Sequence, residues 1–177
     1  MNKKKLIITF VVMFVLLIIV LISLYIGFRQ SVRYAMYDLT LAQKYQDSQT
    51  ALKYYDIEKI ADNAIAEATE ELVNEDNPFA GLGIGILNNM KDSLVAKYRK
   101  DLTEEYESEQ PQLKSLNNIV ILYHTITDKP IAAATITFKK VSKNKVIQTF
   151  TNSEGASMSR TWIKDDSGWK IIELKYQ

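Results

Sequence analysis

The stretch "IAAATITFKKVSKNKVIQTFTNSEGASMSRTWIKDDSGWKIIELKY" (residues 131–176) decides the fold class of this 177-residue chain. Runs rich in β-branched and aromatic residues alternate with the turn sequences "SKNK", "NSEG" and "DDSG". Such spacing is typical of consecutive antiparallel strands joined by short turns. We therefore predict a β meander. Two sets of residues are each expected to share a face: Ala132, Ala134, Ile136 and Phe138, and Ile172, Leu174 and Tyr176.

The segment before the meander, "NIVILYHTIT" (residues 118–127), is also rich in β-branched side chains. We predict that it forms a further strand, so that strands occupy residues 117–176. Residues 101–118 are polar and contain Pro111, which breaks regular structure. They are expected to form the hinge between the two halves of the domain.

Residues 31–110 read as helices. Tyrosines and leucines recur at helical spacing in "SVRYAMYDLTLAQKYQ" (residues 31–46), and "DSQT" (residues 47–50) supplies turn and capping residues. Asp56 is a predicted N-cap, followed by an apolar stripe from Ile57 to Leu72. Helices first and strands afterwards predict an α+β domain, with the helices packed on one face of a curved, cone-like sheet.

The stretch "NPFAGLGIGILNNM" (residues 77–90) has three glycines at alternate positions. Asn77 and Pro78 form a helix-start signature, so one helix is expected to run through Met90 to Tyr98. A phosphate-binding loop would place its glycines before a helix, which excludes that function. Phe79, Gly81 and Gly85 are expected to form a close helix-packing surface, or else a cavity mouth or a membrane contact.

Residues 6–28, "LIITFVVMFVLLIIVLISLYIGF", carry no charge. As a helix they would extend roughly 34 Å, enough to cross a hydrocarbon core of about 30 Å. A cleaved secretory signal has a shorter apolar core and small residues at its cleavage site. The sequence therefore predicts an uncleaved transmembrane signal anchor.

Positive residues flank the predicted span on both sides: Lys3, Lys4 and Lys5 before it, and Arg29 and Arg33 after it. The three lysines favour a cytoplasmic N-terminus by a small margin. Residues 1–5 would then form a short cytoplasmic tail, and residues 29–177 an extracytoplasmic domain in the cell membrane of a bacterium.

The formal net charge of +1 conceals an uneven distribution. Residues 34–110 hold 7 basic and 16 acidic side chains, whereas residues 111–177 hold 10 basic and 5 acidic ones. A nucleic-acid-binding protein would present one coherent basic face, so we expect no nucleic-acid partner. The chain has no cysteine, which excludes disulfides and thiolate metal sites.

The segment "YAMYDLTLAQKYQDSQTALKYYDIEKIADNAI" (residues 34–65) resembles a bacterial family of membrane-anchored proteins, domain of unknown function 2939. "NPFAGLG" and the closing "GWKIIEL" are similar to that family as well. The resemblance implies an anchored bacterial domain and supplies no catalytic residues. The order of helices and meander also resembles the nuclear-transport-factor-like cone fold, which hosts enzymes, ligand binders and scaffolds.

Candidate chemistry is sparse. His124 is the only histidine, too few for a zinc site, and no nucleophile motif accompanies it. Neither a metal nor a cofactor is expected. A pocket enzyme of the cone fold would use a carboxylate beside a tyrosine. The candidates are Asp38 beside Tyr37 and Asp56 beside Tyr55, and His124 is a further one. The residues expected to line a ligand pocket are Tyr37, Asp38, Tyr45, Asp56, Ala134 and Trp162.

The sequence thus predicts a single-pass membrane protein that presents a small, non-catalytic binding or scaffolding domain. Its expected partners are the lipid bilayer and either an envelope protein or a hydrophobic ligand. Three alternatives stay open: a hydrophobic-ligand binder, an assembly component of an envelope or secretion machine, and an Asp/Tyr pocket enzyme.

Overall fold

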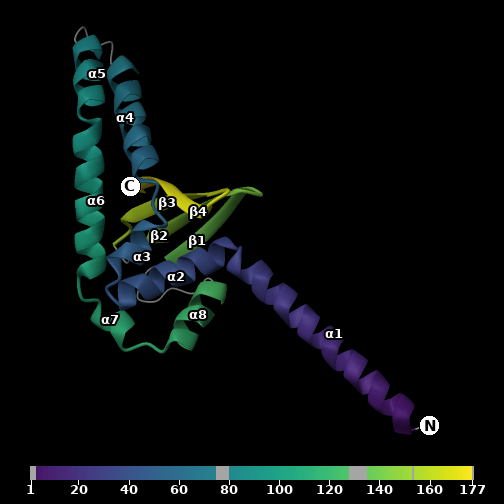
Figure 1. Ribbon diagram of the computed structural model, residues 1–177. Coiled ribbons are helices and arrows are strands. Elements are labelled where there is room, and N and C mark those ends of the chain that lie inside the picture. Colours follow the sequence, from purple (N-terminus) through teal and green to yellow (C-terminus); the bar gives the residue numbers. More distant parts are fainter. Residues whose placement is uncertain (1–2, 75–79, 128–134, 153, 177) are drawn as a thin grey trace.

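The computed structural model describes residues 3–74, 80–127, 135–152 and 154–176 (Figure 1). Helices precede strands along the chain, which confirms the predicted α+β class. The helices are α1 (Lys3–Arg29), α2 (Val32–Lys44), α3 (Ser48–Leu52), α4 (Ile57–Asn74), α5 (Ala80–Asn89), α6 (Lys91–Glu107), α7 (Pro111–Lys114) and α8 (Asn118–Thr127). The strands are β1 (Thr135–Ser142), β2 (Lys145–Thr151), β3 (Ser157–Asp165) and β4 (Gly168–Tyr176).

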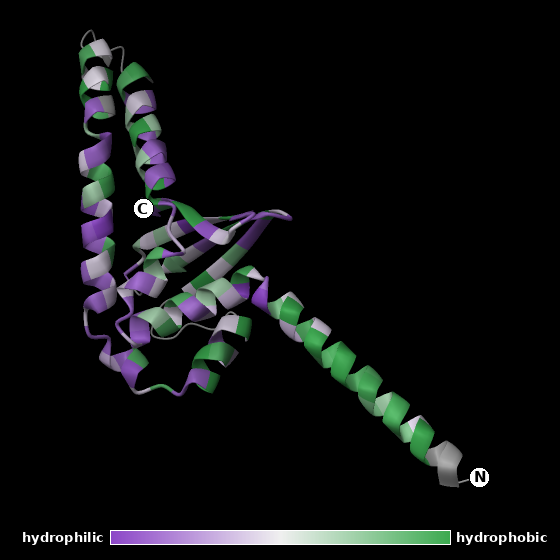
Figure 2. Ribbon diagram, viewed as in Figure 1, coloured by the Kyte–Doolittle hydropathy of each residue, from purple (hydrophilic) through white to green (hydrophobic). Residues whose placement is uncertain are grey.

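Helix α1 projects from the domain as a single apolar rod, which is hydrophobic over nearly its whole length in Figure 2. Its residues Ile7–Arg29 are long and apolar enough to cross a membrane, and none of the span is buried against the domain. Ser31 ends the rod: its hydroxyl donates to the Phe28 carbonyl at 2.6 Å and accepts from the Tyr34 amide at 3.2 Å. Because Ser31 caps α2, the chain changes direction between α1 and α2.

The four strands form one antiparallel sheet in the order β1-β2-β3-β4, as the turn spacing predicts. The register between β3 and β4 shifts next to Trp162, which lies opposite Ile171, whereas Thr161 lies opposite Glu173. This bulge turns Ile171 toward the helices, where it is fully buried. The chain around Tyr55 then pairs with Ile171 and covers that part of the β4 edge.

Residues 118–127 form helix α8, so the predicted strand in this segment is wrong. Asn117 caps the helix, with its side-chain oxygen accepting from the Ile119 amide at 2.9 Å. The hydroxyls of Thr125 and Thr127 donate to carbonyls four residues earlier, which accommodates these β-branched residues in a helix. The packing of this segment against α2 outweighs its intrinsic β propensity, so it folds as a helix.

The predicted helix from residue 77 through Met90 to Tyr98 is also interrupted. It divides at Met90 into α5 and α6, and the Met90 amide donates to the carbonyls of Ile86 and Leu87. Together, α4, α5 and α6 form a long helical arm whose tip, near the α4–α5 connection, lies far from α1 (Figure 1).

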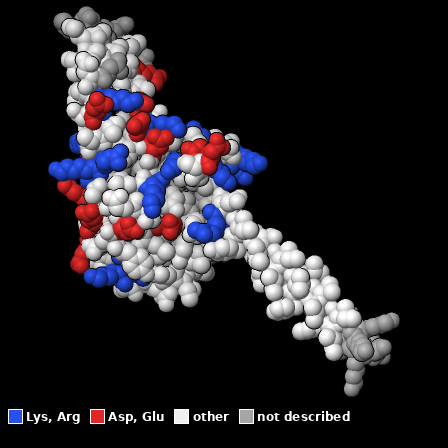
Figure 3. Space-filling model, viewed as in Figure 1, with Lys and Arg blue, Asp and Glu red and all other residues white. Residues whose placement is uncertain are grey.

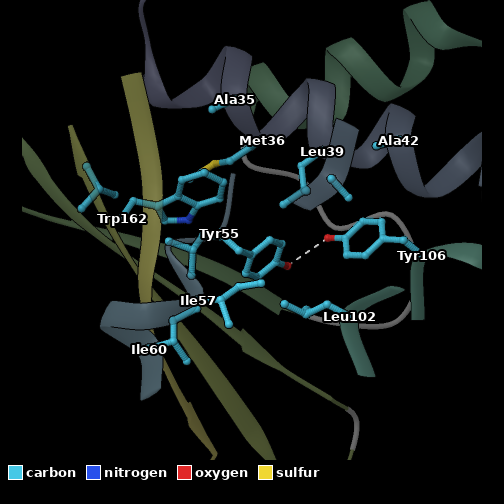
Figure 4. Close-up of a cluster of buried hydrophobic side chains, with 13 residues drawn as sticks. Ala35, Met36, Leu39, Ala42, Tyr55, Ile57, Ile60, Leu102, Tyr106 and Trp162 are labelled. Atoms are coloured by element: carbon cyan, nitrogen blue, oxygen red, sulfur yellow. Dashed lines mark hydrogen bonds between the residues drawn. The ribbon is translucent and has the colours of Figure 1, made fainter. Parts of the chain in front are cut away.

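The core forms where α2, α4 and α6 meet the sheet (Figure 4). Met36 and Leu39 of α2 face Trp162 of β3. Tyr106 of α6 lies at the side of the core opposite Trp162. Spacing of apolar residues at helical intervals on α2 and at alternate positions on β3 brings these side chains together. The core holds α2 across the sheet and fixes the walls of the cavity described next.

Candidate ligand pocket

A cavity of about 380 Å³ lies between α2, α7, α8 and the sheet. Its volume falls within the usual range of roughly 300–1,000 Å³ for small-molecule sites. Much of the wall is apolar or aromatic, with side chains from both the helices and the strands: Met36, Leu39, Phe138, Phe150, Met158 and Trp162.

Strand register builds the sheet wall of this cavity. Gln148 pairs with Phe138 on one side and with Arg160 on the other, so these three side chains form a row across the sheet. A neighbouring row holds Phe150. On each strand the lining residues stand two apart, as expected for one face of a pleated sheet. One charged residue, Arg160, therefore points to the same side as the apolar core.

Arg160 is the unusual member of the wall. Its Nε atom is buried and has no hydrogen-bond partner among the described residues. The guanidinium carbon lies 5.1 Å from the centre of the Phe150 ring, a cation–π arrangement. Burial lowers the pKa of Arg160, but the Coulombic effects of Tyr55, Tyr106 and Glu105 outweigh it and raise that pKa. The guanidinium is therefore a permanent positive charge beside the cavity.

Two buried polar pairs support the site. The Trp162 indole donates to the side-chain oxygen of Gln148 at 3.0 Å. The hydroxyls of Tyr55 and Tyr106 lie 3.0 Å apart, marked by the dashed line in Figure 4. Burial raises the pKa of both tyrosines, so both stay neutral at physiological pH. In each pair the two side chains satisfy each other's hydrogen bonding, and this holds the cavity wall in place.

The rest of the rim is polar and mostly uncharged, with Thr40, Gln43, Gln110, Gln112, His124 and Thr125 among its residues. Glu105 is the one carboxylate among the described lining residues, and its side chain is exposed to solvent. His124 is half-buried on α8. The arrangement combines a positive group at the apolar wall with neutral donors and acceptors around it.

Of the residues predicted to line a pocket, Trp162 does so, and it is fully buried. His124, a candidate for catalysis, lines the same cavity. Ala134 lies outside the described residues. On α2 the cavity-facing side chains are Met36, Leu39, Thr40 and Gln43, so the predicted Tyr37 and Asp38 belong to other faces of that helix.

The other three predicted polar residues have structural roles. Asp38 accepts a hydrogen bond from the Tyr54 hydroxyl at 2.7 Å, and Tyr45 donates to the Asn118 side chain at 3.0 Å. Asp56 caps α4 by accepting from the Lys59 amide at 3.2 Å, as its N-cap prediction requires. Neither Tyr45 nor Asp56 borders the cavity, because helix periodicity and capping direct them elsewhere. Asp56 instead borders a separate, more open pocket together with Arg99 and Lys170.

The helix-packing part of the glycine prediction is corrected as well, whereas its membrane-contact alternative stays a prediction. A Cβ atom placed on Gly81 or Gly85 would meet none of the described atoms within 4 Å, so neither glycine permits a close helix contact there. The glycine that faces the neighbouring helix is Gly83, whose added Cβ would lie 3.0 Å from Leu72 of α4. The i, i+4 spacing of Gly81 and Gly85 puts both on the face turned away from α4. Phe79 lies outside the described residues.

Arg160, Gln148 and Phe150 are site residues that sequence reasoning missed. Their signal is an alternating pattern with a polar residue at a core-facing position: Val146, Gln148 and Phe150 in β2, and Met158, Arg160 and Trp162 in β3. A charge at such a position needs an explanation, because isolated buried charges are costly.

Within the described ranges, no group of three or more His, Asp or Glu side chains is placed to hold a metal ion. No protein family, curated protein or solved structure matches the chain. The site's geometry and chemistry are therefore the basis for the functional proposal.

Proposed function

We propose that this chain is a single-pass membrane protein whose domain binds a small amphipathic ligand with an anionic head. The observation that carries the proposal is the buried Arg160 Nε atom, which lacks a partner beside a largely apolar cavity. A carboxylate or similar anion would accept a charge-assisted hydrogen bond from it. The apolar tail would lie against Phe138, Phe150 and Met158.

The chemistry of the lining favours binding over catalysis. An enzyme of the predicted Asp/Tyr type needs a carboxyl group inside the cavity, where burial can tune its pKa. Glu105 is exposed, and Asp38 and Asp56 are engaged elsewhere. The tyrosine pair is held neutral by burial, which suits packing and hydrogen bonding rather than proton abstraction. We therefore infer a non-catalytic domain that needs no cofactor.

The proposed setting is the cell membrane of a bacterium, with α1 as an uncleaved anchor. Lys3, Lys4 and Lys5 precede the span, which favours a cytoplasmic N-terminus and a domain on the outer side. No nucleic-acid partner is proposed, because the basic residues do not form one coherent face.

A protein-contact role is the second candidate, favoured by the tip of the helical arm. Leu82 and Ile86 of α5 are 70% and 60% exposed there. Exposed apolar groups at the end of a projecting arm suit an envelope protein partner or an assembly component of a secretion machine. The two roles are compatible, because the tip and the cavity are formed by different helices.

The test of ligand binding uses the full chain in phosphatidylcholine nanodiscs, titrated with octanoate and with octan-1-ol. Octanoate is expected to bind at least about tenfold more tightly, since hydrogen bonds to charged groups contribute about 1.5–3 kcal/mol. The variant Arg160→Met should lose that preference, whereas Arg160→Lys should retain part of it.

A matched control is Lys164→Met, which removes a positive charge from the same strand but does not border the cavity. It should leave octanoate binding unchanged. Equal binding of octanoate and octan-1-ol, or an Arg160→Met variant that keeps its preference for octanoate, would contradict an anionic ligand.

A further inference from the structure

Helix α8 presents an apolar face to its surroundings. Ile119, Tyr123 and Ile126 are 73%, 51% and 46% exposed, and their i, i+4, i+7 spacing places them on one side of the helix. The opposite side holds Ile121, which is fully buried. A surface helix that faces water normally turns polar residues outward, so the exposed side of α8 is suited to an apolar environment.

The position of α8 points to what that environment is. The Arg33 guanidinium donates to the carbonyl oxygens of Thr125 and Ile126 at the end of α8. Arg33 lies four residues beyond the end of α1, so the last turn of α8 is tied to the place where the apolar rod leaves the domain. Figure 1 shows α8 near this corner, whereas the tip of the helical arm lies at the opposite end.

Side chains suited to a lipid headgroup region occupy the same corner. The Arg29 guanidinium lies 4.9 Å from the Tyr34 ring centre and 5.9 Å from that of Tyr25. Arginine and tyrosine in this arrangement are typical of the ends of membrane spans. Figure 3 shows neither acidic nor basic side chains along the described part of the rod. Basic side chains begin where the rod meets the domain.

We propose that α8 lies in the interface of the bilayer that α1 spans, with Ile119, Tyr123 and Ile126 at the boundary between headgroups and acyl chains. An interfacial helix binds in this way through one apolar face. The inference rests on the membrane anchoring proposed above, but not on the ligand. Because His124 and Thr125 of α8 line the cavity, α8 would separate that cavity from the lipid.

The experiment places single cysteines in the naturally cysteine-free chain, attaches a nitroxide label, and reconstitutes the protein in nanodiscs of phosphatidylcholine and phosphatidylglycerol. Accessibility to oxygen, which concentrates in lipid, is compared with accessibility to a water-soluble nickel chelate. Ile119→Cys and Tyr123→Cys report on α8. Leu17→Cys reports on the span, and Leu82→Cys is a water control that matches Ile119 in exposure, at 70% against 73%.

Labels at Ile119 and Tyr123 are expected to favour oxygen, as the label at Leu17 does, whereas the label at Leu82 favours nickel. If Leu17 favours oxygen but both α8 labels match Leu82, the interfacial position of α8 is overturned while the anchor stands. If Leu17 also favours nickel, the anchor itself is overturned. Dipolar broadening between Ile119 labels would show that a second copy covers α8, and this too would overturn the proposal.

Discussion

The side-chain oxygen of Gln148 accepts a 3.0 Å hydrogen bond from the indole of Trp162, and both side chains are buried. A buried donor that loses its acceptor keeps its full desolvation penalty. This bond therefore connects the stability of the sheet with the shape of the cavity, since both residues line it.

We expect Gln148→Leu to lower the free energy of unfolding by about 1–3 kcal/mol, because it leaves the indole N–H unpaired. Gln148→Glu keeps an acceptor and adds a negative charge beside Arg160, its cross-strand neighbour. That variant should retain more stability than Gln148→Leu but should lose octanoate binding. Urea denaturation and the nanodisc titration measure the two effects. Equal stability of Gln148→Leu and wild type would show that the bond contributes little.

Arg160→Met is expected to leave the free energy of unfolding unchanged or to increase it. The substitution removes a guanidinium with an unpaired, buried Nε and replaces it with an apolar chain of similar length. Loss of binding without loss of stability would identify Arg160 as a residue kept for its ligand. Thermal denaturation of this variant, with Lys164→Met as control, gives the measurement. A marked fall in melting temperature would instead assign Arg160 a structural role.

The strands were predictable because their signals are local. Turn sequences at regular intervals and alternation within each run depend on neighbouring residues, and the meander follows from them. The capping roles of Asp47 and Asp56 are local in the same way. The long uncharged run of α1 requires no tertiary information either.

The errors arose where tertiary packing decides. The β-branched residues of α8 favour a strand on propensity, but the contact with α2 and the Asn117 cap select a helix. Strict alternation predicts that Ile172, Leu174 and Tyr176 share one face of β4. The bulge beside Trp162 instead places Ile171 opposite Trp162, where Ile171 is buried. A bulge reverses the alternation of every residue before it, and sequence alone gave no sign of this one.

Alanine substitutions in α5 test the corrected glycine geometry. Gly81→Ala and Gly85→Ala should each stabilise the helix by roughly 1 kcal/mol, because alanine favours helix and both positions face open space. Gly83→Ala should gain less, since its Cβ would press on the end of the Leu72 side chain. Hydrogen exchange of the α5 amides in the full chain measures the differences. Reduced protection in Gly81→Ala or Gly85→Ala would mean that these faces are packed.

The hydroxyl pair of Tyr55 and Tyr106 makes a prediction about alkaline pH. Burial raises the pKa of both tyrosines above the unfolded value of about 10, so the folded protein holds their protons more firmly than the unfolded chain. The resulting stability is fully present below the unfolded pKa and is lost as pH rises through the folded pKa. The urea midpoint of wild type should therefore fall from about pH 10 upward.

The double variant Tyr55→Phe/Tyr106→Phe should lose less stability over that interval, because the two groups that titrate are gone. At neutral pH the single variant Tyr55→Phe leaves the Tyr106 hydroxyl buried without its partner. Its loss of unfolding free energy should therefore exceed half of the loss in the double variant. Urea titrations of wild type, Tyr55→Phe, Tyr106→Phe and the double variant, at neutral pH and above about pH 10, complete the cycle. Parallel pH dependence in wild type and double variant would mean that other tyrosines cause the alkaline loss.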